Sequence, residues 1–115
     1  MRIVKVGGVN GLGRTTGTRD APKILLESIG IKDSEEIIID EDNLETQEKL
    51  IYARARELFA RSERVIFIGG DHSISYGLTR AFFEKHKNGK LIVFDAHVDL
   101  MPPMREPTHE EWLRA

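Results

Sequence analysis

Hydrophobic residues in this chain fall into short continuous runs, separated by longer segments of mixed polarity. Four runs have the length and the Val, Ile, Leu and Phe content of buried strands, at residues 2–7, 35–40, 64–70 and 90–95. Strands of a parallel sheet read as continuous apolar runs because helices cover both faces of the sheet. The pattern therefore predicts an α/β fold with a parallel sheet between two layers of helices.

Helix signals occupy the segments between these runs. The first helix is expected over residues 21–29, between Asp20 as N-cap and Gly30 as stop. A long helix is expected over residues 45–62, and a third over about 73–87. Apolar positions at helical spacing are expected at Ile24 and Leu25 in the first helix, and at Leu50, Ala53, Leu58 and Phe59 in the second.

Two of the strand runs end in polar residues with metal-ligand chemistry. The run 64–70 continues into Asp71-His72-Ser73, and the run 90–95 continues into Asp95-Ala96-His97-Val98-Asp99. In open parallel sheets, ligands bind outside the carboxyl ends of the strands. Both polar segments are therefore expected at a functional site.

The Asp-x-His-x-Asp spacing favours a metal site. In extended backbone, residues two apart project to the same side, so Asp95, His97 and Asp99 would point together. Two carboxylates brought together with an imidazole repel each other and lose hydration unless a divalent cation lies among the three groups. Since the chain has no cysteine, this oxygen and nitrogen ligand set suits Mn²⁺ best, with Zn²⁺, Co²⁺, Fe²⁺ or Ni²⁺ as alternatives. A hydrogen-bonded Asp-His-Asp cluster without metal is the other interpretation.

Four further features have less specific interpretations. The glycine-rich segment 7–13 lacks the third glycine and the directly following helix of a dinucleotide fingerprint, so a loop over a site is favoured over nucleotide binding. The acidic residues 40–42 are typical of a solvated turn and helix entrance. Asp71 can be catalytic or can hydrogen-bond neighbouring backbone, and we favour the supporting role. His86 is expected at the surface, at the end of the third helix.

Composition narrows the class of protein. The 115 residues allow one domain, and 40% hydrophobic with 31% charged residues is an ordinary balance for a soluble protein. The net charge of −2 gives no argument for a nucleic acid or a membrane as partner. The chain has no cysteine, no signal-peptide core and no apolar stretch near the ~20 residues of a membrane span, which favours a cytoplasmic location.

The two polar motifs together resemble the ureohydrolase family of arginases, agmatinases and formiminoglutamases. Gly-Gly-Asp-His-Ser at 69–73 and Asp-Ala-His-x-Asp at 95–99 match the family pattern without a departure, and residues 19–24 resemble its N-terminal helix start. The resemblance implies an arginase-like three-layer α/β/α fold, of which this chain would hold the first four βα units. It also implies two Mn²⁺ ions that share six ligands, and four of these have counterparts here: His72, Asp95, His97 and Asp99.

The resemblance also implies a reaction and a role for each residue. Asp95 would bridge the ions, His72 and Asp99 would hold one, and His97 the other. A metal-bridging hydroxide would hydrolyse a linear guanidino or formimino compound to an amine plus urea or formamide. Asp99 would orient the hydroxide, and a loop histidine would protonate the amine. His109 stands in a comparable place in a different sequence context, so a helix residue without a role is an equal alternative.

The last two ligands of the family belong to a later Asp-x-Asp motif that this sequence does not contain. Residues 108–111 have the form of a capping box, yet the chain ends after about two helical turns, so we interpret residues 1–115 as the N-terminal part of a truncated domain. Three interpretations stay open: a ureohydrolase whose other half lies elsewhere, an inactive fragment with partial metal binding, and a split subunit. The expected partners are a small guanidino or amidine substrate and, since exposed strand edges invite pairing, further copies of the chain or a complementing C-terminal half.

Overall fold

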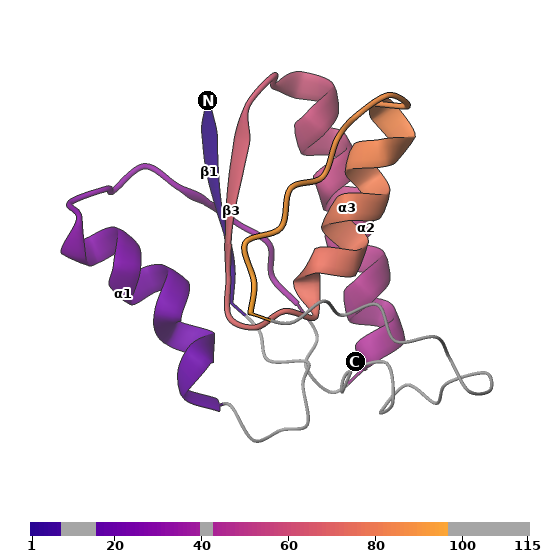
Figure 1. Ribbon diagram of the computed structural model, residues 1–115. Helices are drawn as coiled ribbons and strands as arrows, with labels where there is room; N and C mark the ends of the chain where they lie inside the picture. The colour runs from indigo at the N-terminus through magenta and orange to yellow at the C-terminus, as the bar shows by residue number, and fades with distance from the viewer. Residues whose placement is uncertain (8–15, 40–42, 97–115) are drawn as a thin grey trace.

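The computed structural model describes residues 1–7, 16–39 and 43–96 (Figure 1). The elements follow in the order β1 (Arg2–Val6), a 3₁₀ helix η1 (Thr16–Asp20), α1 (Ala21–Ser28), β2 (Glu35–Glu36), α2 (Leu44–Arg61), β3 (Val65–Gly69) and α3 (Ile74–Lys85). The strands form a parallel sheet in the order β2-β1-β3. The predicted α/β class with a parallel sheet is confirmed.

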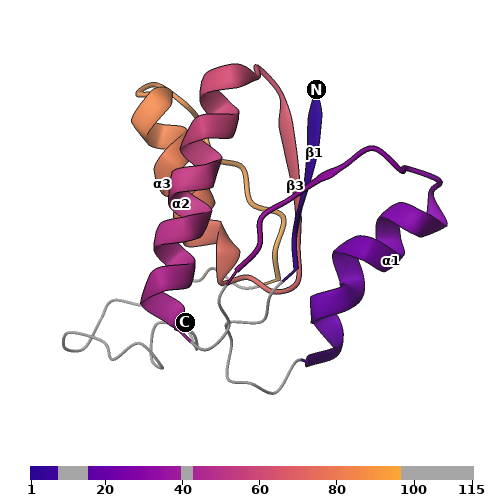
Figure 2. The ribbon, with the colours of Figure 1, turned by 180° about the vertical axis from the view of Figure 1, so that it is seen from behind.

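The helices lie on both faces of this sheet. Figures 1 and 2 show α1 on one side of β1 and β3, with α2 and α3 together on the other side. Crossovers between parallel strands are almost always right-handed. The chain steps from β1 to β2 in one direction and from β2 to β3 in the opposite direction, so the connecting helices α1 and α2 fall on opposite faces. The N-terminal ends of α2 and α3 then lie at the end of the sheet where β1 and β3 finish, which we call the carboxyl edge.

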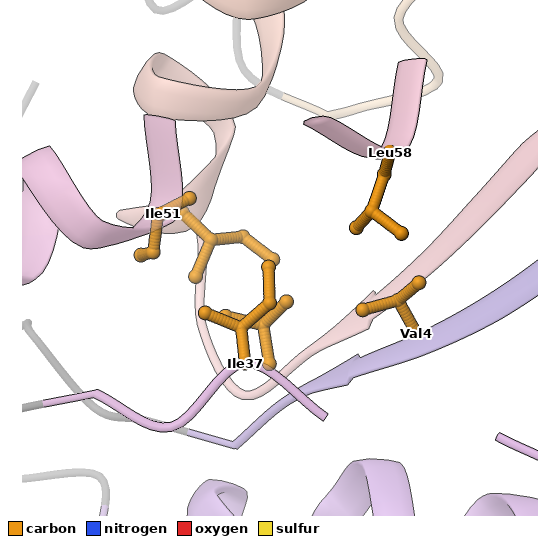
Figure 3. Close-up of a cluster of buried hydrophobic side chains, with 6 residues drawn as sticks. Val4, Ile37, Ile51 and Leu58 are labelled. Carbon is orange, nitrogen blue, oxygen red and sulfur yellow. The ribbon is translucent and has the colours of Figure 1, made fainter. Parts of the chain in front are cut away.

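The core lies between the sheet and the α2–α3 pair. Val4 and Val6 of β1 are fully buried against residues of both helices. Figure 3 shows Val4 and Ile37 beneath Ile51 and Leu58 of α2. This apolar layer fixes the distance between the helices and the sheet, and so positions the loops at the carboxyl edge.

In α1, the predicted ends are close to the observed ones, but the predicted apolar face is wrong. Gly30 follows the helix with a φ of 75°, the left-handed conformation that a glycine stop requires. Asp20 is the N-cap residue, although its side chain makes no capping hydrogen bond. Leu26 is buried, whereas Ile24 and Leu25 are 60% and 48% exposed. The buried residues of this short helix are Pro22 and Leu26, one helical turn apart, so its buried face runs through them.

The predicted face of α2 is also partly wrong. Leu58 is buried as predicted, but Leu50 and Ala53 are exposed, and Ile51 takes the core position. The buried residues of α2 are spaced by four, four and three positions and form one stripe along the helix: Gln47, Ile51, Ala55 and Leu58. None of the described helices, α2 included, has the length and apolar content to cross a bilayer.

Two predicted strands differ from the structure. The second is reduced to Glu35–Glu36, after which the Ile37 N–H still donates to the Lys5 carbonyl at 2.9 Å. The run 90–95 forms no strand, and Phe94 within it is 97% exposed. A strand exists only as part of a hydrogen-bonded ladder. Within the described residues β3 pairs with β1 alone, so three of the four predicted βα units are present there.

A polar network joins α2 and α3 on their outer face. The Tyr52 hydroxyl donates to Oε2 of Glu84 at 2.6 Å, and Nε of Arg56 lies 3.0 Å from the same oxygen. The Arg80 guanidinium lies 4.5 Å from the centre of the Tyr52 ring. The hydrogen bond to Glu84 stabilises the protonated phenol and raises the pKa of Tyr52. The hydrogen bond between Tyr52 and Glu84 therefore joins the helices at neutral pH, and its donor is lost as the pH rises through that raised pKa.

Candidate metal centre

The loop between β3 and α3 begins directly at the carboxyl edge. The Gly70 N–H donates to the Val6 carbonyl at 3.2 Å, so the ladder between β1 and β3 continues to the first residue of the loop. Ser73 is the N-cap residue of α3. Asp71 and His72, the two residues between them, therefore stand where the sequence predicted a site.

Asp71 holds the turn of this loop. Its Oδ1 accepts the Ser73 N–H at 3.0 Å and also accepts the Ser73 hydroxyl. An aspartate that bonds the backbone two residues ahead closes an Asx turn. The structure thus shows the supporting contact that we favoured for Asp71, and this contact fixes the backbone on both sides of His72.

His72 presents an exposed imidazole at this edge. The Ser75 hydroxyl lies 3.1 Å from Nδ1 of His72, and the His72 carbonyl accepts the Ser75 N–H at 3.0 Å. A hydrogen bond to one ring nitrogen restrains the ring orientation, and metal-ligating histidines usually have such a bond. The sequence pattern did not single out Ser75, because a serine in the first helical turn is read as a helix-start residue.

Gly69 brings α3 close to the end of β3. A Cβ at this position would lie 2.1 Å from Cδ1 of Ile74, the first residue of α3. Ile74 is buried and belongs to the core. The glycine therefore lets the first turn of α3 pack directly against the strand end, and the His72 loop is anchored on both sides.

The other predicted site residues divide into one that is described and three that are not. Asp95 is exposed, and the segment 90–96 ends at the same end of the sheet as the His72 loop (Figures 1 and 2). His97, Asp99 and His109 lie outside the described residues. Among the residues that are described, no three His, Cys, Asp or Glu side chains stand close enough to hold a metal ion. The structure therefore brings two ligand-bearing segments to one edge and leaves the rest of the predicted set untested.

The donors at this edge suit the predicted metal. The described candidates are an imidazole and a carboxylate, and the whole chain has no thiolate to compete for a softer ion. Nitrogen and oxygen donors of this kind bind Mn²⁺ and the neighbouring divalent metals. An imidazole that is held by Ser75 but exposed to solvent is oriented and accessible. The residues present thus fit a divalent ion of the manganese class.

Gln47 is a residue of this region that sequence reasoning missed. Its side chain is fully buried, and neither Nε2 nor Oε1 has a hydrogen-bond partner among the described residues. It lies in the first turns of α2, at the end of the helix that reaches the carboxyl edge. Its place four residues before Ile51 indicates that it faces the core only once Ile51 is known to be buried.

Comparison with known proteins agrees with the position of both motifs. The model of the arginase family matches residues 9–113, a range that includes 69–73 and 95–99. An agmatinase of Serratia proteamaculans (strain 568) is 28% identical over 75 residues, which make up 65% of this chain and 24% of that protein. The match thus spans about a quarter of the length of this curated relative. No solved structure was found to match the chain.

Proposed function

The chain belongs to the arginase family, and on this premise we propose that it carries the N-terminal part of a manganese-dependent ureohydrolase centre. The proposed reaction is the hydrolysis of a linear guanidino or formimino compound to an amine plus urea or formamide. The observation that supports it best is the loop at the carboxyl edge. There Asp71 and Ser75 fix His72 in an exposed position, at the edge where the segment that carries Asp95 also ends.

Each site residue has a distinct role in this proposal. The ions would be held by His72, Asp95, His97 and Asp99, with the remaining ligands supplied from outside this sequence. Bound divalent ions would lower the pKa of a water molecule and so supply hydroxide near neutral pH. Asp99 would accept a hydrogen bond from the attacking oxygen and orient it toward the amidine carbon. His109 would donate a proton to the leaving nitrogen as the C–N bond breaks.

An alternative is that this chain binds metal only in part and is inactive unless another polypeptide completes it. The exposed apolar run favours this alternative, because residues that would normally be buried in a sheet have no cover in the described structure. The exposed fractions are 56% for Leu91, 75% for Ile92, 60% for Val93 and 97% for Phe94. We infer that further copies of the chain or a complementing C-terminal half cover this run.

The first prediction separates activity from metal binding. With Mn²⁺ present, the chain should release urea from agmatine or arginine, or formamide from formiminoglutamate, and removal of the ion by a chelator should abolish release. A colorimetric urea assay and calorimetric titration with Mn²⁺ check the two properties on one preparation. Metal binding without product from any of the three substrates would favour the incomplete-centre alternative. Absence of both would contradict the proposed function for this chain.

A second prediction concerns the run 91–94. Since burying a phenylalanine side chain contributes about 1.5–3 kcal/mol, Phe94→Ser should weaken self-association or binding of the complementing half by about tenfold or more. Sedimentation velocity over a range of concentrations measures this. The matched control is Ile24→Ser, which removes an exposed apolar side chain from α1 and should leave association unchanged. Equal association of wild type and Phe94→Ser would contradict the inferred cover.

A further inference from the structure

Gln47 is an exception among the buried residues of the core. Within the described part of the chain it is the polar residue that is fully buried, and both polar atoms of its side chain lack a hydrogen-bond partner there. Its backbone is paired normally, because its N–H donates to the Asn43 carbonyl at 2.9 Å. Buried polar side chains nearly always have a partner, and one that has none calls for an explanation. An apolar side chain of the same size would fill the position without this cost.

The packing of α2 on α3 places Gln47 at the level of the His72 loop. A Cβ at Gly77 of α3 would lie 3.1 Å from Cγ2 of Ile51, which marks where the two helices touch. Both helices begin at the carboxyl edge and run in the same direction. One helical turn toward that edge leads from Ile51 to Gln47 on α2, and from Gly77 to Ser73 on α3.

The buried stripe of α2 gives the direction in which Gln47 faces. Ile51, Ala55 and Leu58 continue the same stripe and are buried between α2, α3 and the sheet. Gln47 is the last residue of this stripe before the carboxyl edge. Gln47 therefore marks the end of this stripe at the carboxyl edge, one helical turn beyond the close approach of Ile51 to Gly77 and level with Ser73 at the start of α3.

We propose that Gln47 is a positioning residue for the metal centre: its buried carboxamide bonds polar groups of the Gly70–Ser73 loop when the loop engages a divalent ion, and so holds His72 in its ligating orientation. This inference rests on the proposed function, since it assigns Gln47 a role in the same centre. Gln47 acts through the loop and touches neither substrate nor metal. A carboxamide offers both donors and an acceptor, so it can bond either a backbone carbonyl or an N–H of the loop.

The test compares Gln47→Met with wild type by calorimetric titration with Mn²⁺ and by thermal unfolding without added metal. Methionine has nearly the same length and volume but forms no amide hydrogen bond. We expect the dissociation constant for Mn²⁺ to rise by about tenfold or more, as for other residues that orient metal ligands. The melting temperature of the metal-free chain should stay equal or rise, because an unpaired buried amide is removed. Lys49→Met is the matched control: it places the same residue at an exposed position of the same helix and should change neither quantity.

Three outcomes overturn the inference. If Gln47→Met binds Mn²⁺ as tightly as wild type, Gln47 has no positioning role, while the proposed function stands. A lower melting temperature of metal-free Gln47→Met would show that the carboxamide supports the fold itself. If wild type binds no Mn²⁺, the proposed function fails for this chain and the role of Gln47 in it fails too, and the wild-type titration identifies this case.

Discussion

Replacing His72 by alanine should weaken Mn²⁺ binding by more than about 100-fold and leave the metal-free fold intact. Loss of a residue that only orients a metal ligand costs about 10–100-fold in affinity, so loss of a ligand should cost more. His72 is exposed and lies in a loop that Asp71 and Ser73 hold without its ring. Its removal costs an exposed hydrogen bond with Ser75 and should therefore change the free energy of unfolding by no more than about 1 kcal/mol. Calorimetric titration and thermal unfolding of the same samples measure the two effects.

Two further variants make this result specific. His86→Ala removes the other described histidine, an exposed residue at the far end of α3, and should bind Mn²⁺ like wild type. Ser75→Ala removes the hydroxyl that lies 3.1 Å from Nδ1 of His72 and should weaken binding by about tenfold. If His72→Ala bound Mn²⁺ as wild type does, the proposed centre would lose the best-supported of its described ligands.

The strands that were predicted correctly are those that pair with another strand within the described residues. The run at 64–70 corresponds to β3 at Val65–Gly69, and it pairs along its whole length with β1. The run at 90–95 has the same apolar composition but no ladder. The preference of a segment for extended backbone depends on its own residues, whereas strand pairing depends on a second segment. An apolar sequence pattern indicates only the local preference. The strand prediction at 90–95 was therefore wrong for a reason that lies outside those residues.

Two residues of the predicted motifs lie at the expected edge of the sheet because their motif follows directly from a strand end. His72 and Asp71 lie at the carboxyl edge because β3 ends at Gly69 and α3 packs at once against it. Gln47 and Ser75 were missed because polar residues within a helix are normally read as its solvated face. Burial of Gln47 depends on how α2 meets α3, which the amphipathic pattern does not specify. The roles of His97, Asp99 and His109 stay predictions, since these residues lie outside the described structure.

Packing also decides between adjacent apolar residues of a helix. Leu50 and Ile51 are both apolar and lie about 100° apart around α2, so the sequence pattern alone does not determine which of them faces the sheet. In the structure Ile51 is 1% exposed and Leu50 is 42% exposed. The close approach at Gly77 accounts for this, because a helix without a side chain at that point accepts the branched side chain of Ile51.

The burial of Ile51 leads to the largest expected effect of a substitution on stability. Ile51→Ala should lower the free energy of unfolding by about 2–5 kcal/mol, since it leaves a cavity between α2, α3 and the sheet. Domains of this kind have a total stability of only about 5–15 kcal/mol, so a large part of the protein would unfold at low denaturant.

Leu50→Ala is the matched control, because the same kind of truncation at the exposed neighbour should cost about 0.5 kcal/mol or less. Ile51→Val, which removes one methylene, should fall between them at about 0.5–1.5 kcal/mol. Urea unfolding followed by circular dichroism measures all three. Equal losses for Ile51→Ala and Leu50→Ala would mean that α2 is rotated from the position described. Since Gln47 lies on the same stripe as Ile51, its burial would then be contradicted too.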